Sequence, residues 1–190
     1  MVNPLSALLE GYKYEILLDI AEFNGITTTT FQGRKLTKNA LIKALCEQLF
    51  TQKRVMQALA QLSGQERVIL DRLLLHDGGV ETNVLRDELQ REDIAQPGPR
   101  SGRLIELYEA DPFNSEANYF EDVIGRLTLR GLVFSTGVPS PWTGSTRLGF
   151  NPGLRLIVPE PVRGYLPQPA LPPVEWGRGN LPALAEETST

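Results

Sequence analysis

The sequence predicts a mainly α-helical protein with a small β-hairpin in its last third. Apolar residues recur at helical spacing, between helix start and stop signals, over most of the first 131 residues. Runs rich in β-branched and aromatic residues are clearest at 132–136 and 154–158. The chain has 190 residues, of which 41% are hydrophobic, so it can form one domain or two small ones with a real core.

The first 50 residues are expected to form a helical hairpin. Its first helix spans 14–23 and ends at Gly25, a residue that tolerates a positive φ. The connection over 26–33 is polar and β-branched, and it is longer than a tight turn between helices. The second helix starts at Thr37, whose side chain can accept a hydrogen bond from a backbone N–H two or three residues further on.

Basic residues gather around the start of this second helix. Residues 23–54 contain six basic side chains and one acidic one, although the whole chain has a net charge of -4. A helix N-terminus carries partial positive charge and unpaired N–H groups, so it receives phosphates well. The predicted phosphate-binding residues are Arg34, Lys35, Lys38 and Lys43. The alternative is that these side chains only keep a surface helix soluble, and charge alone leaves both interpretations open.

This stretch resembles the SAP motif. Asn24-Gly25-Ile26 follows the first helix, and Lys38-x-x-Leu41-Ile42-x-x-Leu45 matches the second-helix pattern Lys-x-x-Leu-Ile-x-x-Leu. The SAP family is a helix–loop–helix module that binds duplex DNA, chiefly through its second helix and the basic loop before it. The resemblance implies that the four cations named above contact DNA. The loop is longer here than is usual in the family, and a threonine stands where the family often has glycine.

Helices and short strands are expected to alternate after the hairpin. A helix over 51–62 is followed by Ser63-x-x-Glu66, a capping-box pattern that starts another helix. The remaining elements are expected to be a very short strand at 80–82, a helix capped by Asn83, a loop over 96–103, a helix from near Asn114 or Ser115 to Gly131, and two strands at 132–136 and 154–158.

The order helix, short strand, two helices and hairpin is that of a winged helix. The segment Arg130-Gly131-Leu132-Val133 resembles the junction between the last helix and the wing in that superfamily. Together with the SAP-like hairpin, it makes the chain similar to the N-terminal part of bacterial helicase-associated proteins. No Gly-x-x-x-x-Gly-Lys-Ser/Thr loop is present. The expected domains are a SAP-like helical hairpin over 1–50, a winged-helix domain with its leading helix over 51–165, and a Pro-rich tail over 166–190.

The winged helix is expected to contact protein rather than to read bases. The last helix of a helix-turn-helix normally enters the major groove. Here the start of that helix is acidic, and 63–165 carries eleven basic and fifteen acidic residues, which opposes phosphate binding. Arg126 and Arg130 in this helix and Arg147 in the wing are predicted as minor DNA contacts.

The supply of catalytic groups is small. The chain has one histidine, His76, and one cysteine, Cys46, which excludes the usual zinc and Cys–His constellations within a single chain. His76 is interpreted as a helix C-terminal residue, Cys46 as a buried structural thiol, and the acidic pairs at 87–88 and 92–93 as solvated charge. No catalytic residue, metal site, cofactor or small-molecule substrate is predicted.

The sequence therefore predicts a non-enzymatic DNA-binding or DNA-associated adaptor. The basic hairpin is expected to contact the backbone of double-stranded DNA without sequence preference, and the winged helix to contact a protein partner. The single cysteine and the lack of a secretory signal or a long apolar run favour a cytoplasmic protein without a membrane segment. The alternative is a protein-only scaffold or interaction module with no nucleic-acid binding.

Overall fold

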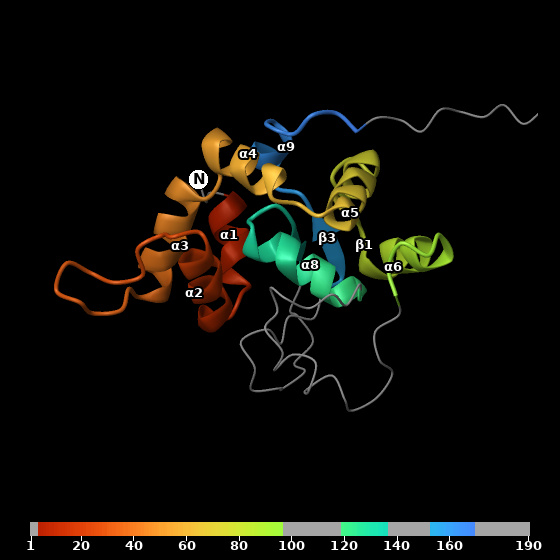
Figure 1. The fold of residues 1–190 in the computed structure, drawn as a ribbon. Helices are drawn as coiled ribbons and strands as arrows, with labels where there is room; N and C mark the ends of the chain where they lie inside the picture. The colour runs from red at the N-terminus through yellow and green to blue at the C-terminus, as the bar shows by residue number, and fades with distance from the viewer. Residues whose placement is uncertain (1–3, 97–118, 137–152, 170–190) are drawn as a thin grey trace, which may run out of the picture.

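The computed structural model describes residues 4–96, 119–136 and 153–169. Within these ranges the chain is mainly α-helical and has one small antiparallel sheet (Figure 1). The predicted fold class is confirmed. The predicted loop over 96–103, apart from Gln96, lies outside the described residues, as do Arg147 in the wing and the tail beyond 169.

Three helices make up the N-terminal part: α1 (Pro4–Glu10), α2 (Tyr14–Phe23) and α3 (Lys38–Gln48). The sequence did not separate α1 from α2. The chain turns after α1, where the N–H of Tyr12 donates to the carbonyl of Leu9 at 3.0 Å. The predicted end of α2 and start of α3 are both present, since Gly25 has a φ of +62° and Thr37 accepts a hydrogen bond from the Ala40 N–H at 3.4 Å.

Helices α4 (Gln52–Ala60) and α5 (Gly64–Leu75) follow. The predicted capping box at the start of α5 is present in both directions. The Glu66 N–H donates to Ser63 Oγ at 3.2 Å, and the Ser63 N–H donates to Glu66 Oε2 at 2.8 Å. Two orphan donors of the helix N-terminus are thereby satisfied.

The sheet contains β1 (Gly79–Glu81), β2 (Phe134–Thr136) and β3 (Arg155–Ile157). Its order is β1-β3-β2, with β3 antiparallel to both neighbours. Helices α6 (Thr82–Arg91) and α8 (Phe120–Leu129) lie between β1 and β2 in the sequence. Among the described residues, the order of elements from α5 to β3 is the predicted one.

Two predicted helix starts are wrong, and two short helices, α1 and α9 (Glu160–Arg163), were not predicted as separate elements. Helix α6 begins at Thr82, one residue before the predicted cap, and the Asn83 side chain instead accepts a hydrogen bond from Arg86 at 2.9 Å. Helix α8 begins at Phe120 rather than near Asn114 or Ser115, because Tyr119 is extended. After β3 the chain forms α9, which tolerates Pro161 because the residue lies in the first turn.

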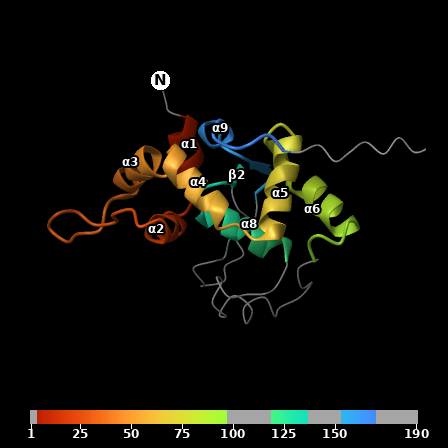
Figure 2. The same cartoon turned by 45° about the horizontal axis from the view of Figure 1, so that its top comes forward.

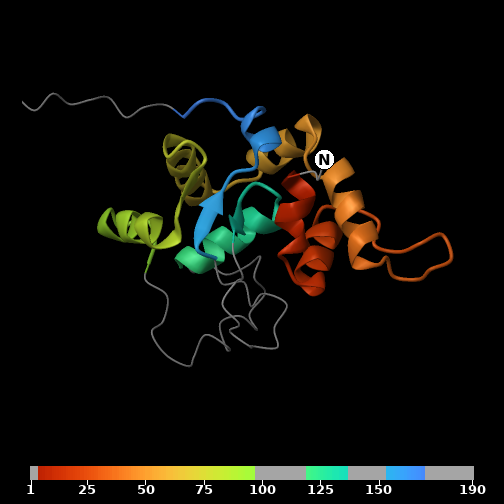
Figure 3. The ribbon, with the colours of Figure 1, turned by 180° about the vertical axis from the view of Figure 1, so that it is seen from behind.

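The buried apolar residues form one cluster that runs from Leu9 to Val162. It crosses the predicted boundary at residue 50. The Tyr12 hydroxyl accepts a hydrogen bond from the Ser135 N–H at 2.7 Å, and its ring meets Phe134 edge to face with centroids 5.7 Å apart. Figure 3 shows α1 and α2 beside the sheet and α8. The N-terminal helices and the sheet therefore share a core.

Helix α8 is enclosed on two sides. It contacts α2 on one side and α5 on the other (Figure 2). Six of its ten residues are buried and the other four are partly buried, so this helix offers no fully exposed side chain.

Candidate nucleic-acid interface

Residues 27–36, between α2 and α3, form a narrow ribbon that extends away from the helices (Figure 1). We call it the finger. The Thr30 N–H donates to the Arg34 carbonyl at 2.7 Å, and the Leu36 N–H donates to the Thr28 carbonyl at 2.8 Å. These bonds flank the antiparallel bridge between Thr29 and Lys35. The finger is thus a short two-stranded hairpin.

The tip of the finger is a tight turn. The Gly33 N–H donates to the Thr30 carbonyl at 2.8 Å, and Gly33 has a φ of +75°. A three-residue loop that ends in a residue with positive φ is a common hairpin connection, and glycine takes that conformation without strain. The loop consists of Phe31, Gln32 and Gly33.

The base of the finger is attached to the helices. The Tyr14 hydroxyl donates to the Leu36 carbonyl at 2.7 Å, and the Leu36 side chain packs against the core. The second strand of the finger then leads directly into Thr37, the N-cap of α3. The orientation of the finger is therefore set by its attachment to α2 and α3.

Arg34 and Lys35 lie on this second strand, and both are exposed. Successive residues of a strand point to opposite faces, so the finger carries one cation on each face. Within the described part of the chain, neither side chain takes part in an ion pair. The sequence from residue 23 to residue 46 contains four basic residues and no acidic one. The finger is therefore an exposed, purely cationic projection.

The other two predicted cations lie on α3. Lys43 is 78% exposed and lies 4.0 Å from Glu47, a surface contact worth little. Lys38 is half-buried, and its Nζ donates to the Glu10 carbonyl at the end of α1 at 2.8 Å. Lys38 therefore supplies a hydrogen-bond donor to a carbonyl at the C-terminal end of α1, and it stabilises the fold as well as carrying a charge.

The structure separates Arg126 and Arg130 from these cations. Both reach the buried carboxylate of Glu66, at 3.0 Å and 3.4 Å, and their side chains are only 13% and 14% exposed. The Arg130 guanidinium also lies over the ring of Phe23, 5.6 Å from its centroid. These two arginines link α8 to Glu66 of α5 and to Phe23 of α2.

No protein-family model, curated protein or solved structure matches the chain. The assignment of a function therefore depends on the residues and their arrangement. The cationic finger is the feature of the described residues that bears most directly on a charged ligand.

The start of α8 is acidic, as the sequence predicted. Glu121 pairs with Arg86 at 2.9 Å, next to Asp122 in the first turn. Burial raises the pKa of Asp122 to about 6, although Arg126 lowers it and Glu121 raises it slightly further. Carboxylates at this end of the helix repel phosphates.

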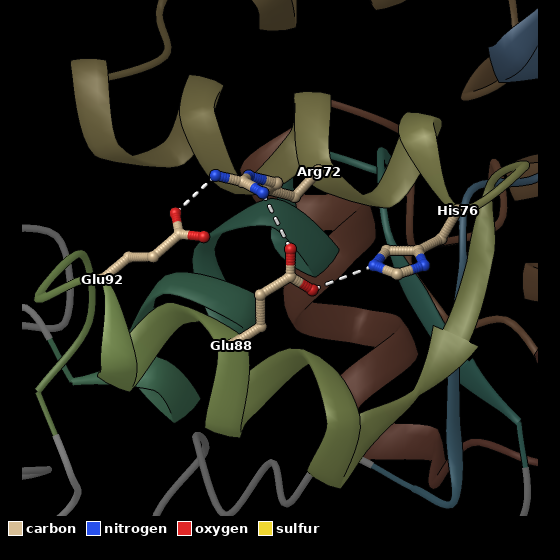
Figure 4. A network of polar contacts seen from close by, with 4 residues as sticks. All are labelled: Arg72, His76, Glu88 and Glu92. Carbon is tan, nitrogen blue, oxygen red and sulfur yellow. Dashed lines mark hydrogen bonds and ion pairs between the residues drawn. The ribbon is translucent and has the colours of Figure 1, made fainter. Parts of the chain in front are cut away.

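A second polar cluster lies between α5 and α6 (Figure 4). Arg72 donates to Glu88 at 2.8 Å and also contacts Glu92, while His76 Nε2 lies 3.0 Å from the second oxygen of Glu88. His76 is the C-cap of α5, close to its predicted position in the last turn. Figure 4 shows the four side chains bridging the two helices, so two of the acidic residues predicted as solvated charge have partners.

The remaining candidates for chemistry are weak. Cys46 is half-buried, and burial, with a smaller effect of Glu47, raises the pKa of its thiol, which is the opposite of what activates a nucleophile. Within residues 4–96, 119–136 and 153–169, no group of three or more histidine, cysteine or acidic side chains could hold a metal ion. Within the same ranges, no helix has the length and apolar character needed to cross a membrane.

Sequence reasoning missed Phe31, whose side chain is fully exposed at the tip of the finger (108%). The signal was present. Four threonines, Phe31, Gln32 and Gly33 followed by a basic pair make a β-branched run with a glycine turn, which is a hairpin pattern. From the sequence we expect only a long connection over this stretch.

Proposed function

We propose that the chain is a non-enzymatic DNA-binding or DNA-associated adaptor. The finger and the first half of α3 contact the phosphate backbone of double-stranded DNA without sequence preference. The observation that carries this proposal is the exposure of Arg34 and Lys35 on the two faces of the finger, in a stretch with no acidic residue. Lys43 adds a third exposed cation nearby on α3.

Element order supports a SAP-like hairpin followed by a winged helix, as in helicase-associated proteins. Helices α2 and α3 with their basic connection correspond to the first module, in which the finger takes the place of a short loop. The strand order β1-β3-β2 and the helices before it correspond to the second. Because α8 is enclosed and its arginines bind Glu66, we assign the winged helix to protein contact rather than to base reading.

The proposed location is the cytoplasm. The single cysteine cannot form a disulfide within the chain, which suits a reducing compartment.

Fluorescence anisotropy with a random-sequence duplex at two salt concentrations tests the proposal. Each phosphate contact contributes about 0.9 to the slope of log affinity against log salt. We expect Arg34→Glu with Lys35→Glu to lower the affinity at least roughly tenfold at low salt and to reduce the slope by about 2. Lys38 is a poorer probe, because its substitution also removes the hydrogen bond to the end of α1.

Arg91→Glu is the control for a charge reversal outside the finger, with one charge reversed rather than two. Arg91 is an exposed arginine in the last turn of α6, away from the finger, and its reversal changes net charge without touching the proposed interface. We expect it to leave the salt slope unchanged. Absence of binding at low salt, or an equal effect of the two reversals, would contradict DNA binding and favour the protein-only scaffold.

A further inference from the structure

We propose that the finger recognises interrupted duplex DNA, with Phe31 stacked on an unpaired base and Arg34 and Lys35 facing the two backbones beside it. This inference rests on the proposed DNA-binding function. It adds a substrate class, namely gapped or forked duplex rather than intact duplex.

The exposure of Phe31 is the first observation. Its side chain is fully exposed, although phenylalanine is among the residues most often found inside proteins. It also lies at the outermost turn of the finger, where it supports no other part of the described fold. An aromatic ring in that place is available to stack on a flat partner.

The second observation is the ordered frame that presents the ring. The two flanking strands are held by bonds at 2.7 Å and 2.8 Å, and the turn by a further bond at 2.8 Å. The Tyr14 hydroxyl fixes the base through Leu36 at 2.7 Å. A frame that is already in place avoids part of the ordering cost of binding.

The third observation is the placement of charge. Arg34 and Lys35 follow the turn directly and point to opposite faces of the ribbon. A projection with a cation on each face is suited to a position between two phosphate backbones. A ribbon lying flat on a single backbone would use one of the two cations and leave the other in solvent.

The cost of reaching a base face favours an interrupted duplex. A β-ribbon can enter the minor groove, but in an intact duplex an apolar side chain at its tip reaches a base face only by unstacking a base step, which costs roughly a few kcal/mol. The major groove admits a ribbon but presents base edges, not base faces. The face of a base becomes accessible where its stacking neighbour is missing, as at a gap or fork, and aromatic side chains bind such bases with little sequence preference.

Anisotropy with two probes of equal length and sequence, one intact and one with a two-nucleotide gap, tests the inference. We expect the unmodified chain to bind the gapped probe more tightly. Phe31→Ala should lower affinity for the gapped probe by roughly 5- to 150-fold and leave affinity for the intact probe unchanged. Phe31→Trp should retain the preference for the gapped probe. The fluorescence of a 2-aminopurine placed opposite the gap should be quenched by the unmodified chain but not by Phe31→Ala.

Met56→Ala is the matched control, because Met56 is another exposed apolar side chain, on α4. We expect it to change neither affinity. Equal affinity for the two probes, equal losses on both in Phe31→Ala, or quenching that persists without Phe31 overturns the stacking inference and leaves backbone binding intact. Failure to bind either probe at low salt instead overturns the proposed function. Thermal unfolding followed by circular dichroism should give the same midpoint for Phe31→Ala as for the unmodified chain, since an exposed side chain contributes little to stability.

Discussion

Arginine serves different purposes beside α8 and in the finger. Arg126 in α8 and Arg130 at its C-cap are only 13% and 14% exposed and pair with Glu66, itself only 2% exposed. In the finger, Arg34 is exposed, and no carboxylate lies nearby in the sequence. The same side chain is therefore part of the core in one region and available for binding in the other.

The difference shows that the count of basic residues does not locate an interface. What matters is whether a carboxylate and an apolar neighbour enclose the guanidinium. Arg130 has both, in Glu66 and Phe23. Three variants test this comparison, ordered by the size of the change expected in the free energy of unfolding.

Glu66→Gln should have the largest effect. Loss of the Glu66 carboxylate removes the ion-pair partner of two mostly buried guanidinium groups, which costs about 3 kcal/mol or more. Urea denaturation measures this loss. The matched comparison is Arg34→Gln with Lys35→Gln, which should change stability by less than about 0.5 kcal/mol because both side chains are exposed. Similar losses of stability in the two variants would contradict the conclusion that Arg126 and Arg130 belong to the core whereas Arg34 and Lys35 do not.

Gly131→Ala should have the second-largest effect on the free energy of unfolding. It tests the junction between α8 and the N-terminal helices. Gly131 has a φ of +74°, and a Cβ there would lie 2.7 Å from Leu49 Cγ. Strain and overpacking together should cost about 2–3 kcal/mol in thermal or urea unfolding.

Gly25→Ala is the control for this prediction. Gly25 also has a positive φ, of +62°, but no atom lies within 4 Å of the position of its Cβ. It should cost only the backbone strain, about 1 kcal/mol. Equal costs at the two glycines would show that Leu49 does not pack tightly against Gly131.

Asp122→Asn should have the smallest effect, and it should stabilise. Because burial raises the pKa of Asp122 to about 6, the folded carboxyl keeps its proton after the unfolded one has lost it. Its contribution to stability is complete below about pH 4 and is lost as the pH rises through about 6. The Asn variant should therefore gain about 1–2 kcal/mol at pH 7.5 and nothing at pH 4. Urea denaturation of both chains at the two pH values measures this gain in the free energy of unfolding. An equal gain at both pH values would contradict the prediction.

The fold was largely predictable because its signals are local. The caps at Thr37 and Ser63 and the glycine stops at 25 and 131 each depend on a few neighbouring residues. Helix starts without a side-chain cap were not predictable in this way. Neither Glu81 nor Tyr119 caps its helix through its side chain, so capping residues in the sequence do not mark the start of either helix.

The candidate site was predictable only in part. Clustering in the sequence identified Arg34 and Lys35, because nearby residues share a surface. The burial of Arg126 and Arg130 depends on Glu66, sixty residues from Arg126, and no local pattern reports that contact. Likewise, no local pattern reports the hydrogen bond from Lys38 to the carbonyl of Glu10, which is distant in the sequence.

The bond between Tyr12 and Ser135 has a consequence for how the chain folds as it is synthesised. The two residues are 123 positions apart, yet they meet in the core. Local helices form within microseconds, whereas β2 and β3 can pair with the rest only after most of the chain has left the ribosome. Until then, the faces of α1 and α2 that later meet β2 and α8 stay uncovered. The N-terminal third thus spends much of translation as a set of helices with exposed apolar stripes, and chaperones should bind the nascent chain there.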